Sequence, residues 1–192
     1  MNSPERYNVW GWREFLPAEG LIDYCAASDD LEAEVRRLEG LGFGVNGPDD
    51  GGRRLPDDVK IRWRSARIRQ EGRPLPFLIE DITPRGLRVP GGRAAEHPNG
   101  ATGISRLEIA ASDTEEVAVS LAALTGAQDD AGTPLWLGAC EISPVASARS
   151  AAGVPGPFAV ELAGETPGDT QELDRDLAHG ARIRLPRRSA GS

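Results

Sequence analysis

Residues 76–80 (PFLIE) and 157–161 (PFAVE) decide the fold that is predicted for this chain of 192 residues. Proline is tolerated at the first position of a strand, and Phe, Ile and Val favour a pleated, half-buried surface. Side chains alternate between the two faces of a strand, so each segment turns its aromatic ring to one face and its glutamate to the other. We therefore predict two strands that present Glu80 and Glu161 on the face opposite a buried phenylalanine.

Other marks recur around these two segments in the same order. The sequence AASD at residues 26–29 returns at residues 110–113, and the pattern Trp-x-x-Ala at Trp63 returns at Trp136. The offsets are 84 and 73 residues, against 81 residues for the two glutamates. Offsets that differ only through loop length are typical of a duplicated unit. The chain is therefore predicted to repeat one order of elements: small-residue strand, helix, tryptophan strand, glutamate strand.

Each copy also carries the pattern of one amphipathic helix. Residues 29–32 (DDLE) and 112–115 (SDTE) have the form of a capping box, in which a side-chain acceptor is followed three residues later by glutamate. Apolar residues then follow at helical spacing: Leu31, Val35 and Leu38 in the first copy, and Val117, Leu121 and Leu124 in the second. Because an apolar stripe needs a sheet to cover, each helix is expected on one face of its sheet and the glutamate on the other face.

Composition and charge exclude several classes of function. The net charge is −8, which makes the chain as a whole a poor partner for nucleic acid or for an anionic membrane surface. The sequence has no apolar run long enough for a membrane span and no signal peptide after Met1. Cys25 and Cys140 are too few for a disulfide framework and lack the spacing of metal ligands. We therefore expect a cytoplasmic protein that binds neither nucleic acid nor membrane.

The chain divides at its turn-rich stretches. We predict a docking segment over 1–19, a first module over 20–85, a linker over 86–102, a second module with an extra C-terminal strand over 103–186, and a disordered tail over 187–192. Within the docking segment, Trp10 and Trp12 predict that residues 8–16 form a short helix or turn packed on the first module, because a solvated tail rarely carries two tryptophans.

The strand predicted over residues 59–68 has one basic face. Val59, Ile61 and Trp63 alternate with Lys60, Arg62 and Arg64. The basic face suggests either an anion site or a solvated outer strand, and we favour the solvated strand because half-exposed strands commonly carry charge on their outer face.

The repeated βαβββ order resembles the vicinal-oxygen-chelate superfamily of glyoxalases, extradiol dioxygenases and bleomycin-resistance proteins. Residues 20–82 are similar to the glyoxalase-like domain family through four stretches: DDLE at 29–32, RLPDDV at 54–59, RWR at 62–64 and LPFLIE at 75–80. The resemblance implies an α+β fold in which two tandem βαβββ modules form an open, concave mixed sheet with helices on the outer face.

The resemblance also implies where a site would lie. Metal-dependent members of the superfamily hold a divalent ion through a His or Glu on the first strand and a Glu on the last strand of each module. Carried over, the last-strand positions fall on Glu80 and Glu161, and the first-strand positions on Tyr24 and Glu108. Histidine is absent from both first-strand positions, and the oxygen-only set suits Mg or Mn better than iron or zinc. We therefore expect no tightly bound transition metal.

Three functions are compatible with these residues. The first is small-molecule binding, without chemistry, in a concave cavity lined by Trp63, Trp136 and the carboxylates. The second is a metal-dependent lyase or isomerase of the glyoxalase type, with Glu80 or Glu161 as the general base. The third is an interaction-only domain in which the glutamates cap a surface. A homodimer is compatible with all three.

Overall fold

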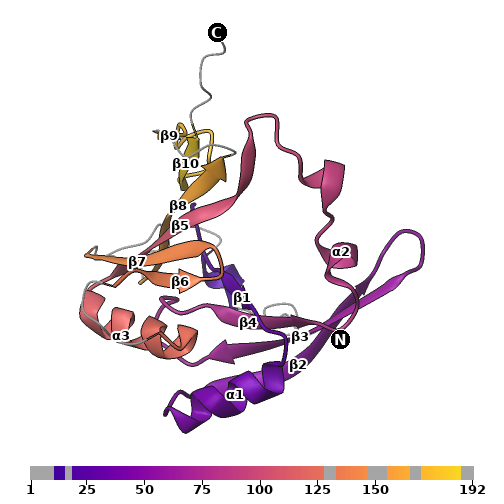
Figure 1. Ribbon diagram of the computed structural model, residues 1–192, viewed down its shortest axis with the longest axis vertical. Coiled ribbons are helices and arrows are strands. Elements are labelled where there is room, and N and C mark those ends of the chain that lie inside the picture. The colour runs from indigo at the N-terminus through magenta and orange to yellow at the C-terminus, as the bar shows by residue number, and fades with distance from the viewer. Residues whose placement is uncertain (1–10, 16–18, 128–132, 147–154, 165–169, 187–192) are drawn as a thin grey trace.

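The computed structural model describes residues 11–15, 19–127, 133–146, 155–164 and 170–186. It has the α+β fold that the family resemblance implies, and its strands form two mixed sheets (Figure 1). The strands form two separate sheets rather than one continuous concave sheet, because the described strands of the two halves are not hydrogen-bonded to each other.

The first sheet has the predicted βαβββ order. Its elements are β1 (Cys25–Ala27), α1 (Leu31–Gly40), β2 (Val45–Arg54), β3 (Lys60–Ile68) and β4 (Phe77–Asp81), and its strand order is β1-β4-β3-β2. The central strand β4 runs parallel to β1 and antiparallel to β3. The segment PFLIE therefore lies in the middle of this sheet.

The second sheet departs from that order. Its elements are β5 (Ala101–Ala111), α3 (Thr114–Thr125), β6 (Leu135–Leu137), β7 (Cys140–Ala146), β8 (Gly156–Gly164), β9 (Thr170–Glu172) and β10 (Arg182–Pro186), in the order β6-β7-β5-β8-β10-β9. Strand β7 is the parallel partner of β5, whereas β8, which carries Glu161, is antiparallel to β5 on its other side. The predicted equivalence of Glu80 with Glu161 is therefore wrong, because β7 and not β8 occupies the place of β4. The long strand β5 can pair along both of its edges, and the sequence repeat does not specify along which edge β8 pairs.

Three short helices complete the described elements: η2 (Trp12–Phe15), α2 (Arg85–Arg88) and η3 (Gly92–Ala95). Helix η2 falls within the turn or helix predicted for residues 8–16, and the indole Nε1 of Trp12 donates to Oδ2 of Asp23 at 2.9 Å. Trp10 lies outside the described residues. No described helix has both the length and the apolar character that crossing a membrane requires.

The two long helices are capped one residue later than predicted. The side chain of Asp30, rather than Asp29, accepts from the backbone N–H of Ala33, and Asp113, rather than Ser112, accepts from Glu116. Each acidic cap satisfies an N–H group that has no partner within its helix.

One core joins both halves of the chain. The apolar stripes of α1 and α3 belong to a single cluster with strands of both sheets; its fully buried members include Leu31, Leu38, Ile109 and Leu121. The guanidinium of Arg37 on α1 donates to the carbonyls of Ala123 and Leu124 at 2.8 and 2.7 Å, where it caps the C-terminal turn of α3. The two helices are therefore held together by packing and by a cationic cap.

Candidate functional site

Glu80 lies on the helix-covered face of the first sheet, which is the opposite of what we predicted. It shares this face with Leu78, which is buried in the core. Its Oε2 accepts from Nε and Nη2 of Arg64 at 3.1 and 2.7 Å, and Nη1 of Arg64 also donates to Glu32 of α1 at 2.6 Å. The hydrogen bond that Arg64 donates to Glu80 is the main cause that raises the pKa of the Arg64 guanidinium. Leu78 rather than Phe77 packs on α1, so Glu80 is turned toward the helix.

Glu108 and Glu161 lie together on the face of the second sheet opposite its core. Arg184 of β10 faces Glu161 in the strand register and donates to Glu108 through Nη1 at 2.7 Å. This hydrogen bond raises the pKa of Arg184, and the charge of Glu161 acts in the same direction. Both carboxylates therefore belong to the surroundings of one arginine on the second sheet, and Glu80 does not join them.

The residues carried over from the family do not fit a metal ion. Glu80 is paired with Arg64 on the first sheet, whereas Glu108 and Glu161 surround Arg184 on the second. Within the part of the chain that the structure describes, no three His, Cys, Asp or Glu side chains are grouped as ligands. No reaction step is therefore derived through a metal.

Tyr24 has a structural place instead of a ligand-binding one. Its phenol donates to the backbone carbonyl of Pro74 at 2.7 Å. Burial raises the pKa of Tyr24 well above its ordinary value, so the phenol is neutral at physiological pH. Tyr24 therefore supports the loop between β3 and β4 rather than facing a ligand.

The two tryptophans lie on different sheets, Trp63 on β3 and Trp136 on β6. The indole of Trp63 lies on Gly51 of the neighbouring strand, where a Cβ atom would approach its Nε1 to 2.3 Å. Trp136 is 52% exposed and borders a separate cavity of about 260 Å³ beside Ala26 and Leu78. Trp63 is not among the residues that line this cavity, so the cavity beside Trp136 does not join the two tryptophans.

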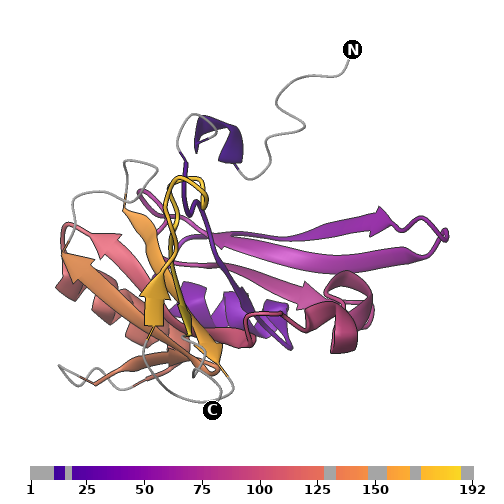
Figure 2. The ribbon, with the colours of Figure 1, turned by 90° about the horizontal axis from the view of Figure 1, so that it is seen from above.

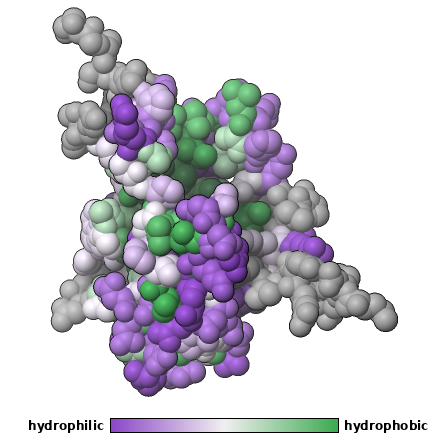
Figure 3. Space-filling model, turned by 90° about the vertical axis from the view of Figure 1, so that its right-hand side faces the viewer, coloured by the Kyte–Doolittle hydropathy of each residue, from purple (hydrophilic) through white to green (hydrophobic). Residues whose placement is uncertain are grey.

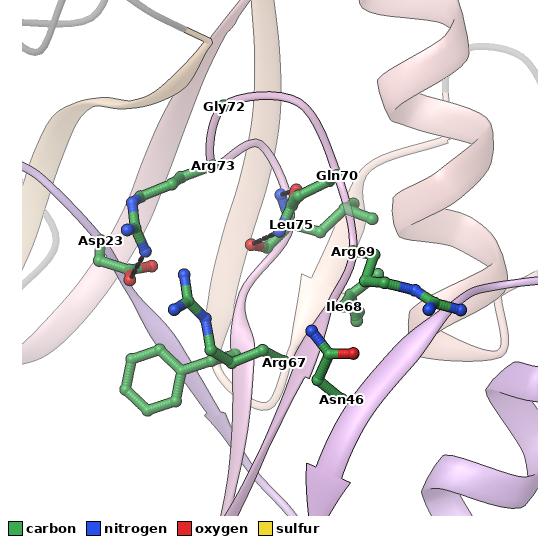
Figure 4. A pocket seen from close by; sticks show the side chains of 10 residues that line it. Asp23, Asn46, Arg67, Ile68, Arg69, Gln70, Gly72, Arg73 and Leu75 are labelled. Atoms are coloured by element: carbon green, nitrogen blue, oxygen red, sulfur yellow. Dashed lines mark hydrogen bonds and ion pairs between the residues drawn. The ribbon is translucent and has the colours of Figure 1, made fainter. Parts of the chain in front are cut away.

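A different pocket lies at the end of the first sheet where β3 leads into β4 (Figure 4). Its volume is about 300 Å³, and most of its lining is polar. The residues that line it are Asp23, Asn46, Arg67, Ile68, Arg69, Gln70, Gly72, Arg73, Leu75 and Phe77. We call this the arginine pocket.

The β3–β4 loop that forms one wall is fixed by its own side chains. The amide of Gln70 accepts from the N–H of Leu75 at 2.7 Å and donates to the carbonyl of Leu75 at 2.8 Å, which closes the loop as a backbone pair would. Gly72 has φ +68°, and a Cβ there would lie 2.6 Å from the carbonyl oxygen of Pro155. This close approach lets the N–H of Arg73 donate to the same carbonyl at 2.8 Å. The wall is therefore anchored to the start of β8.

A buried ion pair holds the second wall. Nη1 of Arg73 lies 2.5 Å from Oδ2 of Asp23, and the two side chains are only 8% and 7% exposed. The same carboxylate accepts from Trp12 Nε1 and from the N–H of Tyr24. Asp23 is thereby fixed in place by three donors.

Arg67 extends from β3 toward the centre of the pocket. It is paired across the strands with Asn46, where a bulge at Gly47 interrupts the ladder between β2 and β3. Gly47 has φ +107°, and a Cβ there would meet the carbonyl oxygen of Ser65 at 2.7 Å. Figure 4 shows the Arg67 guanidinium pointing into the space between Asp23 and Asn46.

The lining carries an excess of positive charge. It contains three arginines, Arg67, Arg69 and Arg73, and one carboxylate, Asp23, in a chain whose net charge is −8. Arginines therefore outnumber carboxylates by three to one among the residues that line the pocket. Guanidinium groups and the amides of Asn46 and Gln70 are suited to binding carboxylates or phosphates. Of the described lining residues, none is a His, Cys, Tyr or Lys.

Sequence reasoning missed these residues. The basic face considered for an anion site was that of Lys60, Arg62 and Arg64, whereas the pocket uses Arg67, which lies on the other face of β3. The signal that was available is the stretch RIRQEGR at residues 67–73, where a strand ends in three arginines around a turn.

Comparison with known proteins supports the fold. The model of a family described as "Glyoxalase-like domain" matches residues 2–125, which include the first sheet, β5 and α3. No curated protein matches the chain. A crystal structure of a hypothetical protein from Staphylococcus aureus is similar with a TM-score of 0.62 and 16% sequence identity, over 85% of this chain and 65% of that one. At this identity the likeness shows the fold alone. Because the family model matches more than half of the residues, the chain belongs to the glyoxalase-like domain family of the vicinal-oxygen-chelate superfamily.

Proposed function

We propose that this glyoxalase-like domain binds a small anionic molecule in the arginine pocket, with Arg67 as the principal contact to a carboxylate of the ligand. The observation that carries the proposal is the composition of the lining, which contains three arginines and one carboxylate, with the guanidinium of Arg67 pointing into the pocket (Figure 4).

The dimensions of the pocket support a small ligand. A volume of about 300 Å³ is at the lower end of the range for small-molecule sites, which is roughly 300–1,000 Å³. Phe77 and Leu75 supply an apolar part beside the guanidinium groups. A ligand with one or two carboxylates on a short carbon skeleton would match both parts.

The rigidity of the walls supports binding at a fixed geometry. The Gln70 amide, the Tyr24 phenol and the Arg73–Asp23 pair all hold the loop from residue 70 to residue 75 in one conformation. A pocket that is ordered before its ligand arrives loses less free energy to ordering on binding.

The proposal is tested by thermal unfolding of the full chain with a panel of mono- and dicarboxylates of two to eight carbons. A ligand present at one hundred times its Kd stabilises the folded state by about 2.7 kcal/mol. At this chain length that corresponds to a rise in Tm of about 5–11 °C.

Variants then assign the binding to the pocket. A hydrogen bond to a charged group contributes about 1.5–3 kcal/mol, so Arg67→Ala should weaken binding roughly 10- to 150-fold. Arg62→Ala is the matched control, because Arg62 lies on the same strand but outside the pocket. If no carboxylate raises the Tm, or if both variants bind equally well, the pocket does not bind this class of ligand. An interaction-only domain would then be the better interpretation.

A further inference from the structure

Strand β2 forms an open edge of the first sheet. In the order β1-β4-β3-β2, its partner among the described strands is β3 alone. Residues 49–54 (DDGGRR) are exposed apart from the half-buried Gly51. Figure 2 shows the β2–β3 hairpin projecting beyond the rest of the sheet. An open edge of this kind has unpaired N–H and C=O groups that can pair with another strand.

The strand register identifies which residues present these groups. Gly52 faces Arg62 of β3, but Arg62 directs its own backbone groups the other way: its N–H donates to Oγ1 of Thr83 at 3.0 Å, and its carbonyl accepts from Ile82 at 3.0 Å. Gly52 and Arg62 are therefore a non-hydrogen-bonded pair of the antiparallel ladder. The N–H and C=O of Gly52 consequently point to the open edge.

Alternation extends this result along β2. Asp50 and Arg54 lie two residues on either side of Gly52, so their N–H and C=O groups point to the open edge as well. The end of the hairpin supports this assignment. The N–H of Leu55 donates to the carbonyl of Val59 across the hairpin at 2.8 Å, so the backbone groups of Leu55 point toward the β3 side and those of Arg54 point toward the open edge. Three residues are thus available for a new antiparallel ladder.

We propose that two copies of this chain pair along β2 about a two-fold axis at Gly52, so that Asp50 of each copy faces Arg54 of the other. The order of charges carries this inference. In an antiparallel pairing about Gly52, the residue two places before the axis always meets the residue two places after it. Asp50 is acidic and Arg54 is basic, so the dimer contains two pairs of opposite charge. Charges on an edge usually prevent self-pairing, but this order of charges favours it.

The backbone also favours this register. An axis at Gly51 keeps the same phase but sets Arg54 opposite Pro48, which has no N–H to donate. From Asp50 to Arg54, the axis at Gly52 instead pairs only residues that have both a backbone N–H and a backbone C=O.

The opposite face of β2 supplies a second contact. With the axis at Gly52, Arg53 of the second copy lies beside Gly51, which the indole of Trp63 covers. A guanidinium over an indole face makes a favourable cation–π contact. In the described part of the chain, Arg53, Asp49 and Asp50 are in no salt bridge, and Arg54 is paired only with the exposed Asp58. Because exposed pairs are weak, the Arg54 guanidinium can exchange Asp58 for Asp50 of the second copy.

The test is sedimentation equilibrium of the full chain in low salt. A single strand edge is smaller than the usual specific interface of about 1,600 Å², so the dimer should become measurable at concentrations of about 0.1–1 mM. Asp50→Arg and Arg54→Asp each set like charges opposite one another, and each should weaken self-association about tenfold. Glu39→Lys is the control, because Glu39 is exposed on α1, away from β2, and this charge reversal should leave association unchanged.

The decisive sample is an equimolar mixture of Asp50→Arg and Arg54→Asp. In the heterodimer both cross-strand pairs are complementary again, so the mixture should associate as the unmodified chain does, although neither variant does so alone. Recovery on mixing cannot come from a fold defect in either variant. A monomeric unmodified chain at 1 mM, unchanged association of the single variants, or failure of the mixture to recover would each overturn the proposal.

Discussion

Removal of either partner from the buried pair of Arg73 and Asp23 should strongly destabilise the folded chain. The side chains of the pair are 8% and 7% exposed, and Asp23 also accepts from Trp12. Asp23→Asn keeps the shape of the side chain but removes the negative charge that lies 2.5 Å from the buried Arg73 guanidinium. Removing one partner of a buried ion pair costs about 3–5 kcal/mol. At this chain length, the expected fall in Tm is about 6–20 °C.

The control for this variant is an exposed pair of the same chemistry. Arg54 and Asp58 lie 2.6 Å apart, but their side chains are 52% and 80% exposed. Asp58 has φ +69°, a conformation that asparagine tolerates, so Asp58→Asn changes the charge without adding backbone strain. Exposed pairs contribute about 0–1 kcal/mol, and Asp58→Asn should therefore have little effect on Tm.

Urea unfolding of three proteins completes the experiment: Asp23→Asn, Arg73→Met, and the double variant. Because the double variant leaves no unpaired buried charge, it should be more stable than the sum of the single changes predicts by at least about 2 kcal/mol. The double variant should also bind the anionic ligand nearly as well as the unmodified chain, since the pair adds no net charge to the pocket. The view that this pair is buried away from water in the pocket wall would be refuted by either of two results. One is a fall in the free energy of unfolding of less than about 1 kcal/mol for Asp23→Asn, and the other is a double variant whose loss equals the sum of the single losses.

Four further predictions follow from the described contacts. Tyr24→Phe removes the hydrogen bond to Pro74 and leaves a buried carbonyl without its donor, so the free energy of unfolding should fall by about 1–3 kcal/mol in urea titrations, and no loss would show that the loop is held by other contacts. The hydrogen bond that Arg88 donates lowers the pKa of Asp81. The stabilising contribution of the Asp81 carboxylate is therefore present above the ordinary carboxyl pKa and is lost as the pH falls through the lowered pKa. Asp81→Asn should flatten the decline of Tm below about pH 4, and an unchanged decline of Tm at acid pH would contradict this. Elemental analysis of the purified chain should find no stoichiometric Zn, Fe or Ni, whereas one equivalent that disappears in Glu80→Ala would show that a metal site exists. Deletion of residues 1–17 removes the Trp12 hydrogen bond to Asp23 and should lower the Tm by several degrees; equal Tm values would show that this segment does not dock.

Local patterns predicted helix α1 and strands β3 and β4 in the first half of the chain, but not the length of strand β2 (Val45–Arg54). The apolar stripe from Leu31 to Leu38 gave the helix, and the alternation in PFLIE gave a strand. The family resemblance gave the βαβββ order that the first sheet has. These signals were strong because each depends on residues that lie within one element.

The face of β4 could not be chosen from the sequence. Phe77 and Leu78 are both apolar, so alternation alone leaves two orientations of the strand. Packing decided between them, because Leu78 contacts the core and Glu80 follows it to the helix side. The place of β8 was unpredictable for a similar reason, since pairing on either edge of β5 satisfies the same pattern.

The arginine pocket could not be assembled from spacing. Asp23, Asn46, Arg67 and Arg73 come from different elements, and each is an unremarkable polar residue in its own segment. Only the bulge at Gly47 and the loop closed by Gln70 bring them together. The short stretch RIRQEGR was the one local sign of a positive cluster.

The most direct test of anion binding at Arg67 is an NMR titration that follows the Nε–Hε signals of the arginine side chains. Saturation with the carboxylate that raises the Tm most should shift the Arg67 signal strongly and the Arg69 signal less, and should leave the signal of Arg62 in place. The Arg67 signal should titrate with the same Kd as the thermal measurement. A saturated sample in which the Arg67 signal does not move, while signals elsewhere do, would contradict the assignment of the ligand to this pocket.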